Sequence, residues 1–130
     1  MEEQEFLGEV QRRAGLASVG EAGVTTRATL TALGEYLVGY EGLDLASRLP
    51  EGLAAILRRE PPDRPQIISF NDFLFRVGEE EGTNPDDEAD PNEALPRARA
   101  VMSVLLEVVE PDEAEDLRLQ FPSEFDPLFE

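Results

Sequence analysis

Two stretches that resemble each other decide the fold of this chain. Residues 26–57 read TRATLTALGEYLVGYEGLDLASRLPEGLAAIL, and residues 98–129 read ARAVMSVLLEVVEPDEAEDLRLQFPSEFDPLF. They align without a gap at an offset of 72, and their identities include Arg27/Arg99, Ala28/Ala100, Leu33/Leu105, Glu35/Glu107, Asp44/Asp116, Leu45/Leu117 and Pro50/Pro122. Such self-similarity is typical of a duplicated supersecondary unit.

The similarity extends to the segment before each stretch. Phe6, Leu7, Val10 and Gly15 recur as Phe73, Leu74, Val77 and Gly82, at an offset of 67. The second copy therefore contains a five-residue insertion, which is the difference between the two offsets. We expect one domain over residues 1–130, with a first repeat at 2–59, a linker at 60–68 and a second repeat at 69–130.

Each copy has the apolar spacing of helices. Phe6, Leu7, Val10 and Ala14 fall at helical intervals, and Gly15 follows at the position where a glycine often ends a helix. In the first copy, three further helices are expected: over about 21–38, over 43–49 and starting at Pro50. In the second copy, we expect one helix after Ser69, which resembles a capping residue, one over about 92–109, one starting at 110 and a last one before Pro127. No stretch alternates with a period of two. The prediction is an all-α fold, a compact helical bundle of two pseudo-repeats with about four helices each.

The composition excludes most side-chain chemistry. The 130 residues contain no His, no Cys and no Lys, and all 11 basic residues are Arg. The protein therefore has no imidazole base, no thiolate nucleophile, no His or Cys metal ligand and no lysine for a Schiff base. We expect no cofactor, and the composition disfavours an enzyme.

The charge balance is strongly acidic. The chain has 29 Asp and Glu, which gives a net charge of −18. Nucleic acids and anionic lipids are both bound through clustered positive charge, so we expect no direct nucleic-acid binding and no membrane binding. The N-terminal residues MEEQE lack the basic character of a signal peptide, and the apolar stretch 101–109 is too short to span a bilayer. These features predict a cytoplasmic protein.

The duplicated motifs resemble a known family. Phe-Leu-x-x-Val begins each copy, Arg-Ala precedes an apolar helix, and Leu-x-x-(Arg/Gln)-(Leu/Phe)-Pro follows. In this order the motifs resemble the domain of unknown function 2267 family of bacteria and archaea. The resemblance covers nearly the whole chain and implies a compact helical domain of two related halves. It implies no activity, because the family has none assigned.

The acidic stretch between residues 79 and 93 is the one candidate for a metal site. Asp86, Glu88 and Asp90 stand at alternate positions, as in calcium-binding loops. An EF-hand loop starting at Asp86 would need Gly at its sixth position and Glu at its twelfth, where this chain has Pro91 and Arg97. A solvated acidic loop is the simpler interpretation.

Charged residues that are identical in the two copies are candidates for contacts between them. Arg27 and Asp44 lie too far apart along one copy to pair within it, because the intervening helix is about 16 Å long. Across a pseudo-twofold axis, Arg27 could meet Asp116, and Arg99 could meet Asp44. We interpret these four residues as structural pairs or helix caps rather than as a ligand site.

The aromatic residues concentrate in the second copy. Phe73 belongs to the apolar stripe of its helix, whereas Phe70 and Phe75 point elsewhere on that helix. These two residues either pack in the core or against the linker, or they belong to a contact patch.

Three functional hypotheses remain open. The leading hypothesis is a non-enzymatic helical protein that acts by macromolecular interaction, with a protein partner or by self-association. The second is a small hydrolase that uses Glu35 and Glu107 as a carboxylate pair. The third is an acidic decoy for a basic protein, because residues 66–130 carry 18 acids and four Arg, against 11 acids and seven Arg in residues 1–65.

Overall fold

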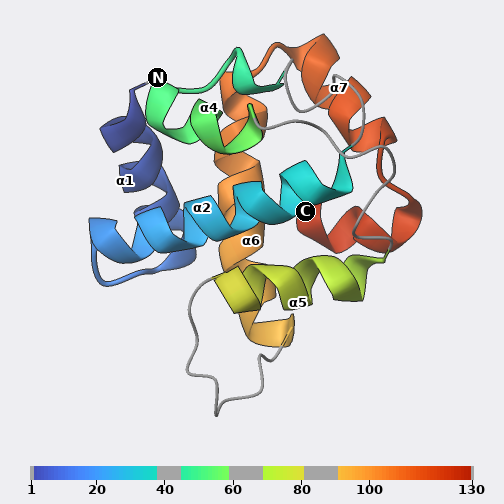
Figure 1. Cartoon of the computed structure of the whole chain (residues 1–130), viewed down its shortest axis with the longest axis horizontal. Coiled ribbons are helices and arrows are strands. Elements are labelled where there is room, and N and C mark those ends of the chain that lie inside the picture. Colours follow the sequence, from blue (N-terminus) through green and yellow to red (C-terminus); the bar gives the residue numbers. More distant parts are fainter. Residues whose placement is uncertain (1, 38–44, 59–68, 81–90, 130) are drawn as a thin grey trace.

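The computed structural model describes residues 2–37, 45–58, 69–80 and 91–129 (Figure 1). In this part of the chain all regular secondary structure is helical, which confirms the all-α prediction. The α-helices are α1 (Glu3–Ala14), α2 (Val19–Tyr36), α4 (Glu51–Leu57), α5 (Phe70–Glu80), α6 (Pro91–Val108) and α7 (Pro111–Leu119), and a 3-10 helix, η1, spans Ser123–Phe129. The helix expected at 43–49 falls partly outside the described residues, and the grouping into two repeats of four helices stays a prediction.

Local signals set the helix ends. The Ser18 hydroxyl accepts a hydrogen bond from the backbone N–H of Glu21 at 3.1 Å, so α2 begins at Val19 rather than at the expected residue 21. It ends at Tyr36 because Leu37 is extended, with φ −75° and ψ 139°. The Ser69 hydroxyl caps α5 in the predicted way, accepting from the N–H of Asp72 at 3.0 Å.

The last helix, expected before Pro127, extends to Phe129. It is a seven-residue 3-10 helix, and Pro127 lies inside it. Proline has no N–H to donate to a helix and its ring clashes with the preceding turn, which disfavours an α-helix at this point. The 3-10 helix still buries Phe125 and Leu128.

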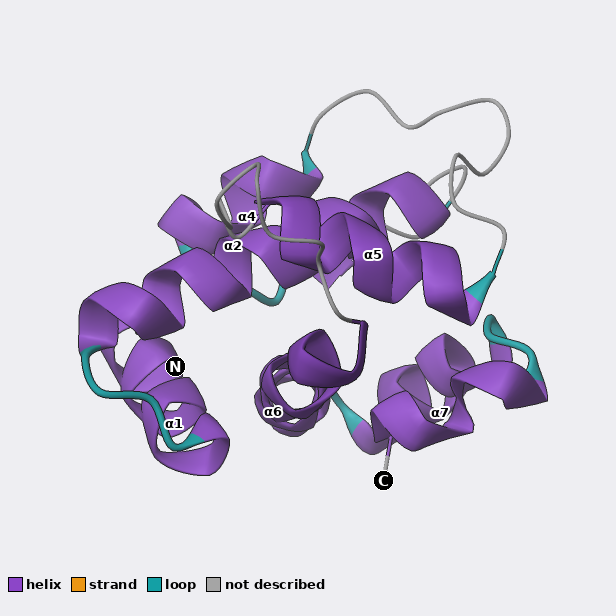
Figure 2. Cartoon of the chain, turned by 90° about the horizontal axis from the view of Figure 1, so that it is seen from below, coloured by secondary structure: helices purple, strands orange, loops and turns teal. Residues whose placement is uncertain are grey.

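Helix α6 runs through the middle of the structure. Viewed nearly along α6, α1 lies on one side of it and α7 with η1 on the other (Figure 2). Helix α1 packs against α2 and α6, and α2 packs against α4, α5 and α6. Helices from the N-terminal half therefore contact helices from the C-terminal half on several faces.

The core consists of the apolar positions that match between the two copies. Both members of the pairs Phe6/Phe73, Val10/Val77, Leu30/Met102 and Leu33/Leu105 are fully buried. Burying a side chain of this size contributes about 1.5–3 kcal/mol each. None of the described helices is long and apolar enough to cross a lipid bilayer.

Gly15 and Gly8 are predicted to respond to alanine in opposite ways. Gly15 follows α1 with φ 67°, in the left-handed region, so Gly15→Ala should lower the free energy of unfolding by about 1 kcal/mol. Gly8 lies inside α1 with open space where a Cβ would stand, so Gly8→Ala should raise stability by about 0.5–1 kcal/mol. Urea unfolding followed by circular dichroism measures both. Equal effects of the two substitutions would contradict this assignment.

Thr26 is predicted to be a site of stabilisation. Its side chain is fully buried in α2, and its hydroxyl has no hydrogen-bond partner among the described residues. Thr26→Val removes the unsatisfied hydroxyl and keeps the shape, so it should raise the free energy of unfolding by about 1 kcal/mol. The control is Thr29→Val, because the Thr29 hydroxyl donates to the Thr25 carbonyl at 2.9 Å. A gain for Thr29→Val as large as that for Thr26→Val would contradict the argument.

Candidate functional site

Helix α7 lies on the surface near the C-terminus of the described chain. Pro111 occupies its first turn, where a fixed φ and a missing N–H cost nothing, and acids follow it at Asp112 and Glu113. The basic residue of the helix, Arg118, is in the last turn, where it complements the helix dipole. Within α7, all of which is described, only Leu117 is buried. The rest of the helix faces solvent or the hollows beside it.

The corner that follows α7 is held against α2. The ring of Phe121 stacks on the ring of Tyr36, with centroids 4.5 Å apart and planes 9° from parallel. The Tyr36 hydroxyl donates a hydrogen bond to the carbonyl of Gln120 at 3.1 Å. These two contacts fix where α7 ends and where η1 begins.

Helix η1 is held by contacts from α5 and α6. Phe125 is fully buried, and its ring meets that of Phe70 at 5.2 Å in an edge-on arrangement. The Nε of Arg99 donates a hydrogen bond to the carbonyl of Pro127 at 2.8 Å. The charge of the guanidinium strengthens this bond, which ties η1 to α6.

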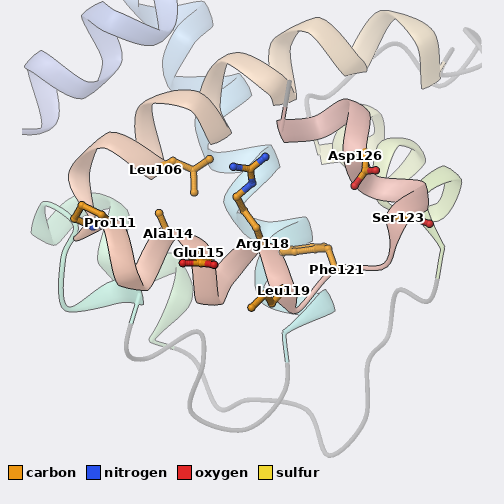
Figure 3. Close-up of a pocket in the computed structure, with 9 residues that line it drawn as sticks. All are labelled: Leu106, Pro111, Ala114, Glu115, Arg118, Leu119, Phe121, Ser123 and Asp126. Carbon is orange, nitrogen blue, oxygen red and sulfur yellow. The ribbon is translucent and has the colours of Figure 1, made fainter.

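Two open hollows lie on either side of Leu119. The larger, of about 800 Å³, is lined by residues of α6, α7 and η1: Leu106, Pro111, Ala114, Glu115, Arg118, Leu119, Phe121, Ser123 and Asp126 (Figure 3). The second, of about 400 Å³, is lined by Leu45, Val109, Glu113, Asp116, Leu117, Leu119 and Gln120. We call the surface formed by these two hollows the α7 groove.

Leu119 is the most exposed large apolar side chain in the described part of the chain. It is 75% exposed, and it borders both hollows. In the alignment of the two copies it matches Ser47, a polar residue. A leucine that replaces a polar residue in one copy was the signal in the sequence for this site, and our sequence analysis did not use it.

Arg118 reaches into the larger hollow. In Figure 3 its guanidinium lies near Leu106, while Ser123 and Asp126 come from the η1 side. The guanidinium carbon is 5.7 Å from the centre of the Phe129 ring, which is a cation–π distance. No carboxylate among the described residues forms an ion pair with Arg118. The cation is positioned by an aromatic ring and is available to a ligand.

Glu113 is fixed at the edge of the groove by an arginine. Arg48 donates to its two carboxylate oxygens, from Nη2 at 2.5 Å and from Nε at 3.1 Å. The hydrogen bonds to Glu113 raise the pKa of the Arg48 guanidinium, because they stabilise its charged form. Glu113 is thereby the neutralised acid of this surface.

Of the two predicted pairs between the copies, the structure describes both members of one, Arg27 and Asp116. Arg27 is exposed on α2 and Asp116 is exposed on α7, and these two described residues do not form an ion pair. Asp44 lies outside the described residues, so the pairing of Arg99 with Asp44 stays a prediction. Among the described residues, Arg99 donates a hydrogen bond to the Pro127 carbonyl. Alignment of the two copies shows which positions are equivalent but not how far apart they lie in space. The predicted pairing of Arg27 with Asp116 is wrong for this reason.

The two predicted aromatic candidates have different positions. Phe70 is half-buried and packs on Phe125, which favours the core interpretation. Phe75 is 49% exposed on α5 and does not line either hollow of the α7 groove. It serves below as a control for Leu119.

Glu35 and Glu107 each have an arginine of their own. Arg76 binds Glu35 through two parallel hydrogen bonds, Nη2 to Oε1 at 2.8 Å and Nε to Oε2 at 2.9 Å. Arg13 donates from Nη2 to both oxygens of Glu107, at 2.7 and 2.9 Å. In each pair the arginine and the glutamate belong to different halves of the chain, so these ion pairs join the two halves.

The two carboxylates raise the pKa values of the arginines that bind them. The hydrogen bonds to Glu35 raise the pKa of Arg76, and those to Glu107 raise the pKa of Arg13, in both cases against the opposing effect of burial. Charged, bidentate pairs of this kind fix geometry as well as contribute energy. This arrangement supports a structural role for both glutamates.

The acidic candidates for metal binding, Asp86, Glu88 and Asp90, lie outside the described residues. Among residues that the structure describes, no three His, Cys, Asp or Glu side chains gather in a way that could hold a metal ion.

Comparison with known families identifies the chain. A family model described as an uncharacterized conserved protein, DUF2267, matches residues 3–128. The chain belongs to the DUF2267 family. This match confirms the resemblance seen in the duplicated motifs. No curated protein matches the chain.

The bidentate pair between Arg76 and Glu35 is predicted to stabilise this DUF2267 protein. Their side chains are only 33% and 16% exposed, so Arg76→Gln removes the bidentate pair from a mostly buried carboxylate. We expect the free energy of unfolding to fall by about 1–2 kcal/mol, between the values for exposed and buried pairs. Arg12→Gln is the matched control, because Arg12 pairs with Glu9 on the surface of α1. The control should change stability by less than about 0.5 kcal/mol, and urea unfolding that ranks the two variants equally would contradict the prediction.

Proposed function

We propose that this DUF2267 protein is a non-enzymatic interaction protein that binds a partner protein through the α7 groove. The observation that carries the proposal is Leu119, which is 75% exposed between two hollows. A large exposed apolar side chain that borders two hollows supports a binding site, since exposed apolar groups lower their free energy when a partner covers them.

Arg118 supports the same proposal. Arginine and aromatic residues are enriched among the residues that dominate binding energy in protein interfaces. Arg118 is already held over the Phe129 ring, so binding a partner costs less side-chain entropy than it would for a free arginine. The groove therefore combines an apolar anchor and a positioned cation on one surface.

The anchored corner favours binding without rearrangement. Phe121 lines the larger hollow and is stacked on Tyr36, and Phe125 is buried directly behind it. A surface whose supporting side chains are already packed pays less to order itself when a partner arrives.

The other two hypotheses have less support from these contacts. For the hydrolase, Glu35 and Glu107 each bind an arginine of their own, which occupies the carboxylate oxygens that such a mechanism needs. For the decoy, the support is the uneven charge of the two halves, and the acids at 81–90 lie outside the described residues.

The test compares position 119 with position 75. A photoreactive phenylalanine analogue placed at either position is irradiated in native lysate, and the adducts are identified by mass spectrometry. We expect a specific protein adduct from position 119 and none from position 75. The identified protein is then purified and titrated against the unmodified chain, Leu119→Ser and Phe75→Ser.

We expect Leu119→Ser to weaken binding of that partner by at least about tenfold, since loss of an anchor that dominates the interface costs more than about 1.4 kcal/mol. Phe75→Ser should change the affinity by less than about twofold. Both variants must keep the melting temperature of the unmodified chain. Equal losses for the two variants, or adducts at both positions alike, would contradict the proposal. A stable homodimer in light scattering that Leu119→Ser dissociates would make the partner a second copy.

A further inference from the structure

Apolar residues and acids line both hollows of the α7 groove. In the larger hollow, Leu106 and Ala114 form apolar parts of the lining, and Glu115 and Asp126 are its acids. In the second hollow, Val109 and Leu117 are apolar, and Glu113 and Asp116 are acidic. Leu119 lines both hollows. We call the four acids Glu113, Glu115, Asp116 and Asp126 the acidic rim of the groove.

Most of these rim charges are not neutralised by the protein. Residues 110–129 contain seven acids and one basic residue, a net charge of −6. Glu113 is paired with Arg48, but Glu115, Asp116 and Asp126 are exposed and have no ion pair with any described residue. Like charges on one surface repel each other, and a cationic partner relieves this repulsion.

We propose that the α7 groove binds an amphipathic α-helix of its partner, with an apolar stripe flanked by Lys or Arg. This inference rests on the proposed function and adds the chemistry of the partner. The apolar side chains of such a helix recur every three or four residues along one face, so successive ones enter the hollows on the two sides of Leu119. The flanking cations then meet the free carboxylates of Glu115, Asp116 and Asp126.

A second copy of the chain fits this surface less well. It would bring a net charge of −18 and the same seven acids against the same rim. At low salt the repulsion opposes such a dimer, whereas it favours a basic partner. Arg118 also suits the helix, because its guanidinium lines the larger hollow and can donate hydrogen bonds to a carboxylate or carbonyl at the C-terminal end of the partner helix.

The experiment uses a synthetic leucine–lysine amphipathic helix of about five turns as the probe. Because a lysine-rich peptide is attracted to any acidic surface, its site must be located as well as its affinity. The peptide is titrated into ¹⁵N-labelled full-length protein, and amide shifts are mapped by NMR. We expect the largest shifts in α7, η1 and the C-terminal end of α6. Largest shifts in α1, α4 or α5 would overturn the proposal.

Variants separate the apolar and the charged contributions. Leu119→Ser should weaken peptide binding about tenfold, and Phe75→Ser, the matched exposed apolar residue, should leave it unchanged within about twofold. The double variant Glu115→Gln with Asp116→Asn should weaken binding several-fold at about 50 mM NaCl and have little effect at about 500 mM, where charges are screened. A leucine–glutamate peptide of the same length should not bind. Equal binding of the two peptides, or an equal loss for Leu119→Ser and Phe75→Ser, would overturn the inference.

The outcome separates this inference from the proposed function. If the partner found by crosslinking at position 119 depends on Leu119 but is not displaced by the leucine–lysine peptide, the groove binds a protein of other chemistry, and only the inference is wrong. If no Leu119-dependent partner is found and the peptide also fails to bind at α7, both are wrong.

Discussion

The buried ring of Phe125 is the contact on which the C-terminal part of the structure depends. Phe125 is fully buried, and four other aromatic rings pack against it. The centroid distances are 5.1 Å to Tyr36 of α2, 5.2 and 6.0 Å to Phe70 and Phe73 of α5, and 5.1 Å to Phe121. Because these rings come from distant parts of the chain, the cluster fixes η1 and the preceding corner against α2 and α5. The position of α7, and so the shape of the α7 groove, follows from this anchor.

Ion pairs between the two halves fix the relative positions of the helices, which the apolar contact alone does not. Arg13 of α1 binds Glu107 of α6 and donates to the Ser103 hydroxyl at 2.6 Å, while Arg76 of α5 binds Glu35 of α2. Apolar burial is not directional, whereas bidentate hydrogen bonds allow only a narrow range of helix positions. Together the apolar cluster and the ion pairs hold the two halves in one arrangement. The helices that support the α7 groove are therefore already in place before a partner binds.

Parts of the site could be predicted from sequence and parts could not. The motifs that indicated the DUF2267 family and the acidic character of the second half were visible at once. The arginines of the ion pairs were not, because comparison of the two copies looked for identities, and Arg13 aligns with Glu80 while Arg76 aligns with Glu9. The pairing of Arg27 with Asp116 was wrong for a related reason, since equal places in two copies do not imply contact between them. Leu119 was overlooked because an apolar residue in a short helix is expected to be buried.

The sequence by itself determined the helices and which apolar residues enter the core. Helical periodicity, the proline positions and the capping residue Ser69 act over one or two turns, so they can be recognised without knowing the rest of the fold. Only the tertiary structure decided which face of α7 is covered. The stacking of Phe121 on Tyr36 and the burial of Phe125 turn Leu117 inward and leave Leu119 in solvent. This orientation depends on contacts between residues more than 80 positions apart, which no local pattern in α7 records.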